Sequence, residues 1–529
     1  MQSVSLQAIN KQDPQIQGQA LDEFENDSDL HGNRRKYDPK DDQRDMEALA
    51  DIWKRRFRFF STVGYVIVLG LTWEYTLITT VFSLANGGTA GAIWLTLIVC
   101  VGMSMVTLSF AEMASMAPTS GGQYHWVSEF APPRYQKQLS YTVGWLAAIG
   151  WQVLMAGVAF VGAQQTQALI VVCNPNHVIT GWHSALLSIA FMVCAILFNT
   201  LAIGKITILE GLAIVLHFFG FVAFIVILWV MGPRAGPDTF SQFTDENDWG
   251  NLGLATLVSI VGPMTTYLGS DSAVHLAEEL EDASYILPRA MCLAAIVNYI
   301  LGFSMTITFM FNLGSLKDDL ASATGQPWVA VIQRITRSRA ASIILTVLMI
   351  IMFFFCAVNV LTTSSRQVFA FARDKGIPFH RFFSQVRSNG VPTNSVFLTL
   401  TVTILLSLIL IGSTAAFNII LSVGTTGLFT SYIVVIGTML AKRLRRGERF
   451  PASKFDLGTF GIPINIGAIC FLVVAFAFLF FPAAPDPSLA DMNWAIVIYG
   501  AAILFAFSWY LAKGRHEYEG PVTYVRKDM

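Results

Sequence analysis

Apolar residues dominate this chain in runs that are far longer than the helices of soluble proteins. Four long stretches contain no Asp, Glu, Lys or Arg, at residues 75–111, 139–204, 388–441 and 462–485. About 20 apolar residues in a helix are sufficient to cross the roughly 30 Å hydrocarbon core of a bilayer, so each stretch can hold one or two membrane spans. The pattern therefore predicts an all-α integral membrane protein.

We expect twelve transmembrane helices, separated by short polar or basic connections. Residues 1–50 are polar and mixed in charge, which is typical of a disordered tail, and they show no cleavable signal peptide. The membrane-spanning body would then cover residues 51–512, and residues 513–529 would form a short second tail. The expected spans lie near residues 60–83, 91–116, 139–170, 183–203, 207–231, 252–275, 288–313, 340–368, 393–412, 415–441, 463–482 and 493–512.

The placement of basic residues orients these spans, since cytoplasmic loops are enriched in Lys and Arg. With the amino terminus inside, only five of the 34 Lys and Arg residues fall in outer loops: Arg234, Lys317, Arg334, Arg337 and Arg339. Both termini are thus predicted to face the cytoplasm. The group from Arg334 to Arg339 is expected to belong to a short external helix.

Composition changes this interpretation little. Of the 529 residues, 54% are hydrophobic and 13% are charged, which excludes an ordinary soluble domain. The spacing of the six cysteines fits neither a metal site nor a set of disulfides. The basic runs 366–387 and 442–454 are typical of membrane anchors and not of nucleic-acid binding surfaces. No phosphate-binding GxxxxGK motif and no nucleophile with a placed base is present, so we expect neither an enzyme nor an ATP-driven pump, and no cofactor or metal.

Three segments resemble a known transporter family. They read AEMASMAPTSGGQYHWVSEFAPP at residues 111–133, GSDSAVHLAEELEDASYILPRAM at residues 269–291 and SSRQVFAFARDKGIPF at residues 364–379. The first resembles the signature of the amino acid, polyamine and organocation transporters, and the set is similar to the fungal amino acid and choline permeases, which include γ-aminobutyrate permeases. The resemblance spans roughly residues 55–515.

This resemblance implies a fold of two inverted five-helix repeats plus two further helices, with helices 1 and 6 interrupted at the membrane midplane. Unwound backbone there would offer free N–H and C=O groups and partially charged helix ends to a substrate. The resemblance also implies a substrate site between helices 1, 3, 6 and 8 and transport by alternating access.

On helix 1, the candidate substrate-binding residues are Gly70, Thr72, Trp73 and Glu74. A carboxylate inside a span is costly unless it is partnered or protonated, which makes Glu74 a functional candidate. The alternative is a structural hydrogen bond or a position nearer the surface. An ionised Glu74 would repel a substrate carboxylate, so either the substrate is chiefly a cation or Glu74 is protonated when it binds. This favours amines over simple α-amino acids.

On helix 6, the counterparts are Gly269, Ser270 and Asp271. The resemblance implies an aromatic gate at the position of Ser270, from which this chain departs. Asp271 can contact a substrate amine, shape the unwound turn or carry a proton. The following acids, Glu278, Glu279, Glu281 and Asp282, are expected to form a solvated cytoplasmic cluster.

Other polar residues in the spans add candidates. Glu210 and His217 are seven residues apart on helix 5 and so share a face. Histidine changes charge near neutral pH, so Glu74, Glu210, His217 and Asp271 are the candidate proton carriers; a neutral His217 bonded between helices is the alternative. Gln152 on helix 3 and Asn359 on helix 8 complete the predicted substrate site.

These patterns predict a permease that imports a small amine or amino acid, such as γ-aminobutyrate, choline or a polyamine, with the proton as the coupling ion. A non-transporting nutrient receptor on the same fold and an amino acid exchanger are the alternatives. The plasma membrane is favoured over the vacuolar membrane, and the sequence assigns no oligomeric state.

Overall fold

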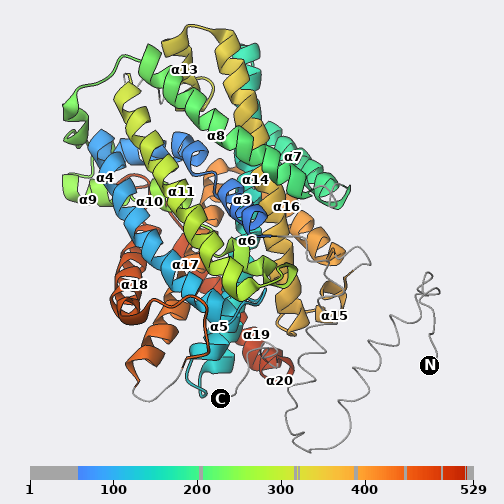
Figure 1. The fold of residues 1–529 in the computed structure, drawn as a ribbon. Helices are drawn as coiled ribbons and strands as arrows, with labels where there is room; N and C mark the ends of the chain where they lie inside the picture. The colour runs from blue at the N-terminus through green and yellow to red at the C-terminus, as the bar shows by residue number, and fades with distance from the viewer. Residues whose placement is uncertain are drawn as a thin grey trace, which may run out of the picture. The chain divides into compact units, whose positions relative to one another are not determined.

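The chain folds into a helical body, drawn in Figure 1 from a computed structural model. The structure describes residues 58–201, 206–314, 319, 322–386, 391–445, 450–489, 492–518 and 520. The predicted tail at residues 1–50 lies outside the described residues. Within the described part of the chain all regular elements are helical, and no β-strand is present, which confirms the all-α prediction.

Ten helices in the described residues are long and apolar enough to cross a membrane. One of these stretches, Phe59–Met116, is 58 residues long, about twice the length that one crossing requires. The count of twelve needs this stretch to cross twice and the interrupted segment after residue 251 to cross once, and it stays a prediction. The other long helices are α6 (Gln136–Cys173), α7 (Gly181–Leu201), α8 (Ile206–Met231), α11 (Ala283–Asn312), α14 (Arg339–Arg373), α16 (Thr393–Gly412), α17 (Thr414–Leu444), α18 (Gly461–Phe478) and α19 (Ala495–Trp509).

The first helix is interrupted, as predicted. It consists of α3 (Phe59–Gly70) and the start of α4 (Thr72–Met116), and between them Leu71 has left-handed backbone angles, φ 41° and ψ 46°. Helix α3 packs against α8, α11 and α14, so the break lies inside the bundle (Figure 1). A second non-helical residue, Gly88, bends α4 with φ 66°, so that residues 59–87, which include α3, and residues 89–116 are each long enough to span a membrane.

The sixth segment is also interrupted, which confirms the second predicted break. It consists of α9 (Leu252–Val258), α10 (Val261–Thr266) and the 3₁₀ helix η3 (Ser272–Glu279). Residues 267–271 between α10 and η3 have no regular structure, and Gly269 has φ 105°. Pro263 within α10 removes one backbone donor, so this segment is already weak as a helix.

Shorter helices connect the long ones. Helix α13 (Pro327–Thr336) is a short helix in the predicted region, but of the group from Arg334 to Arg339 it holds only Arg334: Arg337 follows its end and Arg339 begins α14. The membrane side on which α13 lies stays a prediction. Helix α5 (Gln123–Phe130) lies within the sequence motif at residues 111–133, and α15 (His380–Phe383) follows α14. Both are too short to span a membrane.

The end of the described chain packs against the body. Helix α19 continues through the π turn η5 (Tyr510–Gly514) into α20 (Arg515–Glu517), past the expected boundary at residue 512. Tyr518 is fully buried, and its hydroxyl lies 2.7 Å from Ser140 Oγ of α6. The carboxyl-terminal helix is therefore anchored at its end and not only by its apolar face.

The expectation of a solvated acidic cluster after the sixth segment is wrong for two of its four acids, Glu278 and Glu279, whereas Glu281 is exposed. Glu279 is buried with 3% of its surface exposed, and it is paired with Arg366 of α14. Glu278 is paired with Arg373 of the same helix at 2.9 Å. These two acids hold η3 against α14, because an unpaired buried charge would be costly; they are not part of a solvated cluster.

We predict that Gly88→Ala destabilises the fold. An added Cβ would lie 2.6 Å from Gln242 O and 2.8 Å from Thr244 N, and the left-handed φ is unfavourable for alanine. The expected loss is about 2 kcal/mol, measured as a lower unfolding temperature of the purified protein in detergent. The matched control is Gly437→Ala in α17, where nothing lies within 4 Å of the new atom. Equal unfolding temperatures for the two variants would contradict the prediction.

Candidate functional site

The two helix breaks lie against each other. An added Cβ on Gly269 would lie 3.2 Å from Leu69 Cδ2, which is two residues before the break in helix 1. The φ of 105° at Gly269 is a conformation that residues with a Cβ rarely adopt. Glycine at this position therefore gives both the unwound turn and the close approach of segment 6 to helix 1.

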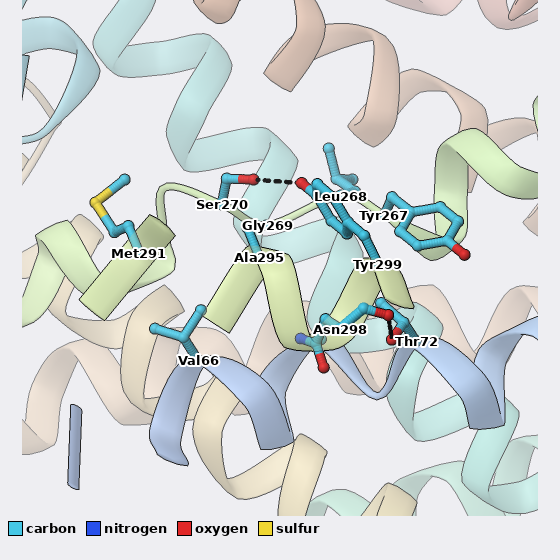
Figure 2. Close-up of a pocket in the computed structure, with 11 residues that line it drawn as sticks. Val66, Thr72, Tyr267, Leu268, Gly269, Ser270, Met291, Ala295, Asn298 and Tyr299 are labelled. Carbon is cyan, nitrogen blue, oxygen red and sulfur yellow. Dashed lines mark hydrogen bonds between the residues drawn. The ribbon is translucent and has the colours of Figure 1, made fainter. Parts of the chain in front are cut away.

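A cavity opens beside the two breaks, and Figure 2 shows the side chains around it. Its empty volume is about 320 Å³, including the open space at its mouth. Its walls come from helix 1, from the unwound turn of segment 6 and from α11. The lining residues are Val66, Gly70, Thr72, Tyr267, Leu268, Gly269, Ser270, Met291, Ala295, Asn298 and Tyr299.

Four predicted substrate-binding residues line this cavity: Gly70, Thr72, Gly269 and Ser270. Five others do not line it: Trp73, Glu74, Gln152, Asp271 and Asn359. The third wall is α11, helix 7 of the predicted order, where a site between helices 1, 3, 6 and 8 was expected. Direct substrate contact by these five residues stays a prediction.

Hydrogen bonds hold the cavity walls together. Thr72 Oγ1 donates to the carbonyl oxygen of Asn298 at 2.6 Å, and Thr107 Oγ1 donates to Ser270 Oγ at 2.8 Å. Ser270 Oγ lies 3.4 Å from the hydroxyl of Tyr299, and Figure 2 marks this contact and the one between Thr72 and Asn298. Among the described residues that line the cavity, none carries a charge. The walls therefore offer neutral oxygen atoms.

Asp271 is the centre of a hydrogen-bond cluster directly after the unwound turn. Its carboxylate accepts hydrogen bonds from Gln123 Nε2, from Trp151 Nε1 at 3.1 Å and from the hydroxyl of Tyr432. His275 Nε2 lies 3.7 Å from the same carboxylate, which is fully buried. The three donors come from α5, α6 and α17, so Asp271 fixes the turn to three other elements.

Glu74 is paired with His217, which connects helix 1 to α8. Glu74 Oε1 lies 2.8 Å from His217 Nδ1, and both side chains are fully buried. Trp73 packs on the same helix, with its ring 5.9 Å from that of His217 and 5.2 Å from that of Phe224. In this conformation Glu74 makes the structural hydrogen bond that was the alternative to facing the substrate.

Glu210 belongs to a second buried polar group on α8. Asn359 Nδ2 of α14 lies 3.3 Å from Glu210 Oε2 and 3.3 Å from the carbonyl oxygen of Tyr65 in α3. The hydroxyl of Tyr65 in turn donates to the carbonyl oxygen of Asn359 at 2.7 Å. Asn359 therefore links α3, α8 and α14. The remaining predicted amide, Gln152, donates to the carbonyl oxygen of Ser364 at 3.3 Å.

Side chains of η3 and of the end of α14 form a second polar cluster. A smaller cavity there is lined by Ser120, His275, Glu278, Glu279, Arg366 and Phe369. Directly after α14, Asp374 accepts a hydrogen bond from the hydroxyl of Tyr124 at 2.7 Å. Burial raises the pKa of Asp374 to about 6, against the opposing effect of Arg373. The ion pairs Arg366–Glu279 and Arg373–Glu278 hold η3 against α14 beside this cavity.

The part of the cavity wall formed by α11 was not predicted from the sequence. Asn298, Tyr299 and Met291 line the cavity, and none of them was a candidate. The available signal was Asn298, the only strongly polar side chain between residues 290 and 305 of an apolar helix. Most such residues bond across helix contacts, so the signal alone does not identify a site.

Comparison with known proteins gives one matching family. Residues 57–503 match the model of the family described as amino acid permease. An uncharacterized amino-acid permease of Schizosaccharomyces pombe is 29% identical, over 93% of this chain and 88% of that protein. Amino-acid permease 2 of Neurospora crassa is 26% identical, over 90% and 89%, and the choline transporter of Saccharomyces cerevisiae is 25% identical, over 88% and 82%.

Solved structures of similar fold include a manganese transporter of Eremococcus coleocola. That structure aligns with a TM-score of 0.55 at 13% identity and covers 86% of this chain and 94% of its own. At this identity the likeness shows the fold alone. The described residues of this chain contain no group of three His, Cys, Asp or Glu side chains that can hold a metal ion.

We predict that Asp271→Asn destabilises the folded protein. The amide would direct a donor at side chains that already donate, so at least one buried hydrogen bond is lost, at a cost of about 2 kcal/mol or more. The measurement is the unfolding temperature and the yield of monodisperse protein in detergent. Asp456→Asn, at an exposed aspartate, is the control. Wild-type stability of the Asp271 variant would show that the cluster is not structural.

Proposed function

The chain belongs to the amino acid permease family, and on that premise we propose that it is a secondary active transporter that imports a small amine or amino acid. γ-Aminobutyrate, choline and polyamines are the substrates that we would test first. The choline transporter among its relatives is consistent with an amine. The transport would proceed by alternating access, with the site reached from one side of the membrane at a time.

The observation that carries this proposal is the cavity at the two helix breaks. It is lined by helix 1, the unwound turn of segment 6 and α11, and its polar atoms are neutral. Interrupted helices are tolerated in a membrane where their free backbone groups line a cavity and bind a polar solute. A small solute with an ionic group fits such a site better than a large or wholly apolar one.

Proton coupling is the second part of the proposal, and it rests on Glu74 and His217. Together, a carboxylate and an imidazole 2.8 Å apart can hold or release a proton inside the bundle. Glu74 follows Thr72, which lines the cavity, by two residues. If helix 1 moves relative to α8, the pair separates and a buried charge loses its partner, so proton binding and helix movement would be linked. Glu210 and Asp271 remain further candidates.

The closed cluster between η3 and α14 supports alternating access. Arg366 and Arg373 are paired there with Glu279 and Glu278, and opening a path would require these pairs to separate. We assign this end of the bundle to the cytoplasm, with both termini on the same side, and we place the protein in the plasma membrane. Fluorescence of a tagged chain, with accessibility of the tag before and after permeabilisation, tests both assignments.

We predict that uptake of labelled substrate depends on an inward proton gradient and that Glu74→Gln removes this dependence. The test is uptake of γ-aminobutyrate, choline, putrescine and a set of amino acids by cells that lack their own permeases, at several external pH values. Loss of one charge-assisted hydrogen bond of roughly 1.5–3 kcal/mol lowers gradient-driven uptake by about tenfold or more.

The matched control is Glu281→Gln, at an exposed acid, which should behave as wild type. An exchanger would instead show uptake that depends on internal substrate and not on the gradient, with Glu74→Gln unchanged. A surface-expressed chain that takes up none of the compounds would contradict the transporter proposal and favour a receptor.

A further inference from the structure

Asn298 of α11 connects the two halves of the broken helix 1. Its carbonyl oxygen accepts a hydrogen bond from Thr72 Oγ1 in α4, at 2.6 Å. Its side-chain Nδ2 donates to the carbonyl oxygen of Ile67 in α3, at 3.4 Å. An added Cβ on Gly70 would lie 2.6 Å from the same Nδ2 atom, so the glycine allows this close approach. The position of the Asn298 side chain is therefore fixed by the break itself.

The other side-chain atom of Asn298 has an unused hydrogen-bonding capacity. Its Oδ1 has no partner among the described residues, and only 4% of the residue's surface is exposed. An unpaired buried acceptor costs roughly 1–3 kcal/mol, so this atom calls for a partner that the described residues do not supply. Asn298 lines the cavity beside the helix breaks (Figure 2). A ligand with a hydrogen-bond donor would satisfy this atom.

The surroundings of Oδ1 favour a positively charged donor. Helix α3 ends at Gly70 and α10 ends at Thr266, and the cavity is lined by Gly70 itself and by Tyr267, directly after α10. The carboxyl-terminal end of a helix carries a partial negative charge. The rings of Tyr267 and Tyr299 can add cation–π attraction, and no lining residue supplies a competing positive charge.

We propose that Asn298 Oδ1 accepts a hydrogen bond from an ammonium N–H of the substrate, so that the site selects protonated primary amines over quaternary ammonium compounds. This inference rests on the proposed transport function and adds a specificity-determining residue to it. A trimethylammonium group has no N–H to donate, and it would leave Oδ1 unpaired.

An organic ammonium group fits the cavity better than a sodium ion does. Val66, Leu268 and Met291 contribute apolar walls, which suit the carbon chain of an amine. The hydroxyls of Thr72 and Ser270 already take part in hydrogen bonds with protein atoms. No carboxylate lines the cavity to balance a bare ion.

The test is competition for uptake by two methylation series on fixed carbon skeletons. One series is ethanolamine, N-methylethanolamine, N,N-dimethylethanolamine and choline, and the other is 4-aminobutyrate and its N-trimethyl analogue. All members of the first series keep the hydroxyl, so only the number of N–H donors and the size of the head group change. Wild type should lose affinity stepwise, by about tenfold or more from the primary to the quaternary member.

Two substitutions separate the acceptor from the structural bond to Ile67. Asn298→Leu removes both and should weaken the primary amines by about tenfold while leaving the quaternary ones unchanged. Asn298→Asp loses the donor to Ile67 but keeps an acceptor oxygen, so it should retain the preference for primary amines. Asn312→Leu is the matched control, because Asn312 is on the same helix, is fully buried and has an unpartnered Oδ1, but lies outside the cavity.

Three results would overturn the inference. The first is equal or better competition by the quaternary members in wild type, and the second is an unchanged preference in a stably expressed Asn298→Leu protein. The third is a loss of uptake when potassium replaces sodium, with Asn298→Leu insensitive to the exchange, which would assign the atom to a sodium ion. Each of these results contradicts the role of Asn298 but leaves the proposed transport function in place. Failure to take up any amine or amino acid would contradict the transport function as well.

Discussion

The need to pair every backbone N–H and C=O group inside the membrane governs this structure. Continuous helices meet that need within themselves, and an interrupted helix does not. Here the two interruptions, at Leu71 and at residues 267–271, lie against each other and open onto a shared cavity. Gly269 makes this arrangement possible because its backbone angles are unfavourable for a residue with a Cβ, and an added Cβ would lie 3.2 Å from Leu69 Cδ2. The position of the site is thus a consequence of where the two helices are interrupted.

Buried charged side chains, like backbone groups, need partners inside the membrane. Each buried acid near the breaks has a partner on another element: Glu74 on α8, Asp271 on α5, α6 and α17, and Glu279 on α14. Breaking such a pair is expensive, and moving it as a unit is not. A movement that separates one of these pairs therefore has to be offset by a new partner or by proton binding.

Much of the fold could be predicted from the sequence because its determinants are local. Lack of charge marks the apolar helices, and the glycine beside polar residues at 269–271 marks the second break. The wall of the cavity formed by α11 could not be predicted, since nothing in the local sequence tells which face of that helix Asn298 occupies. Likewise, four acids at residues 278–282 look solvated until Arg366, 87 positions later, is placed beside Glu279. Pairings between distant segments decide both cases.

The left-handed turn at Leu71 sets an energy scale for the molecule. A residue with a Cβ in that conformation carries a strain of roughly 1–2 kcal/mol, which its buried surroundings must hold. One proton that crosses a difference of one pH unit releases about 1.4 kcal/mol. The strain at this single turn and the free energy of a modest ion gradient are thus similar in size. Ordinary cellular driving forces are therefore strong enough to change the conformation of the first helix.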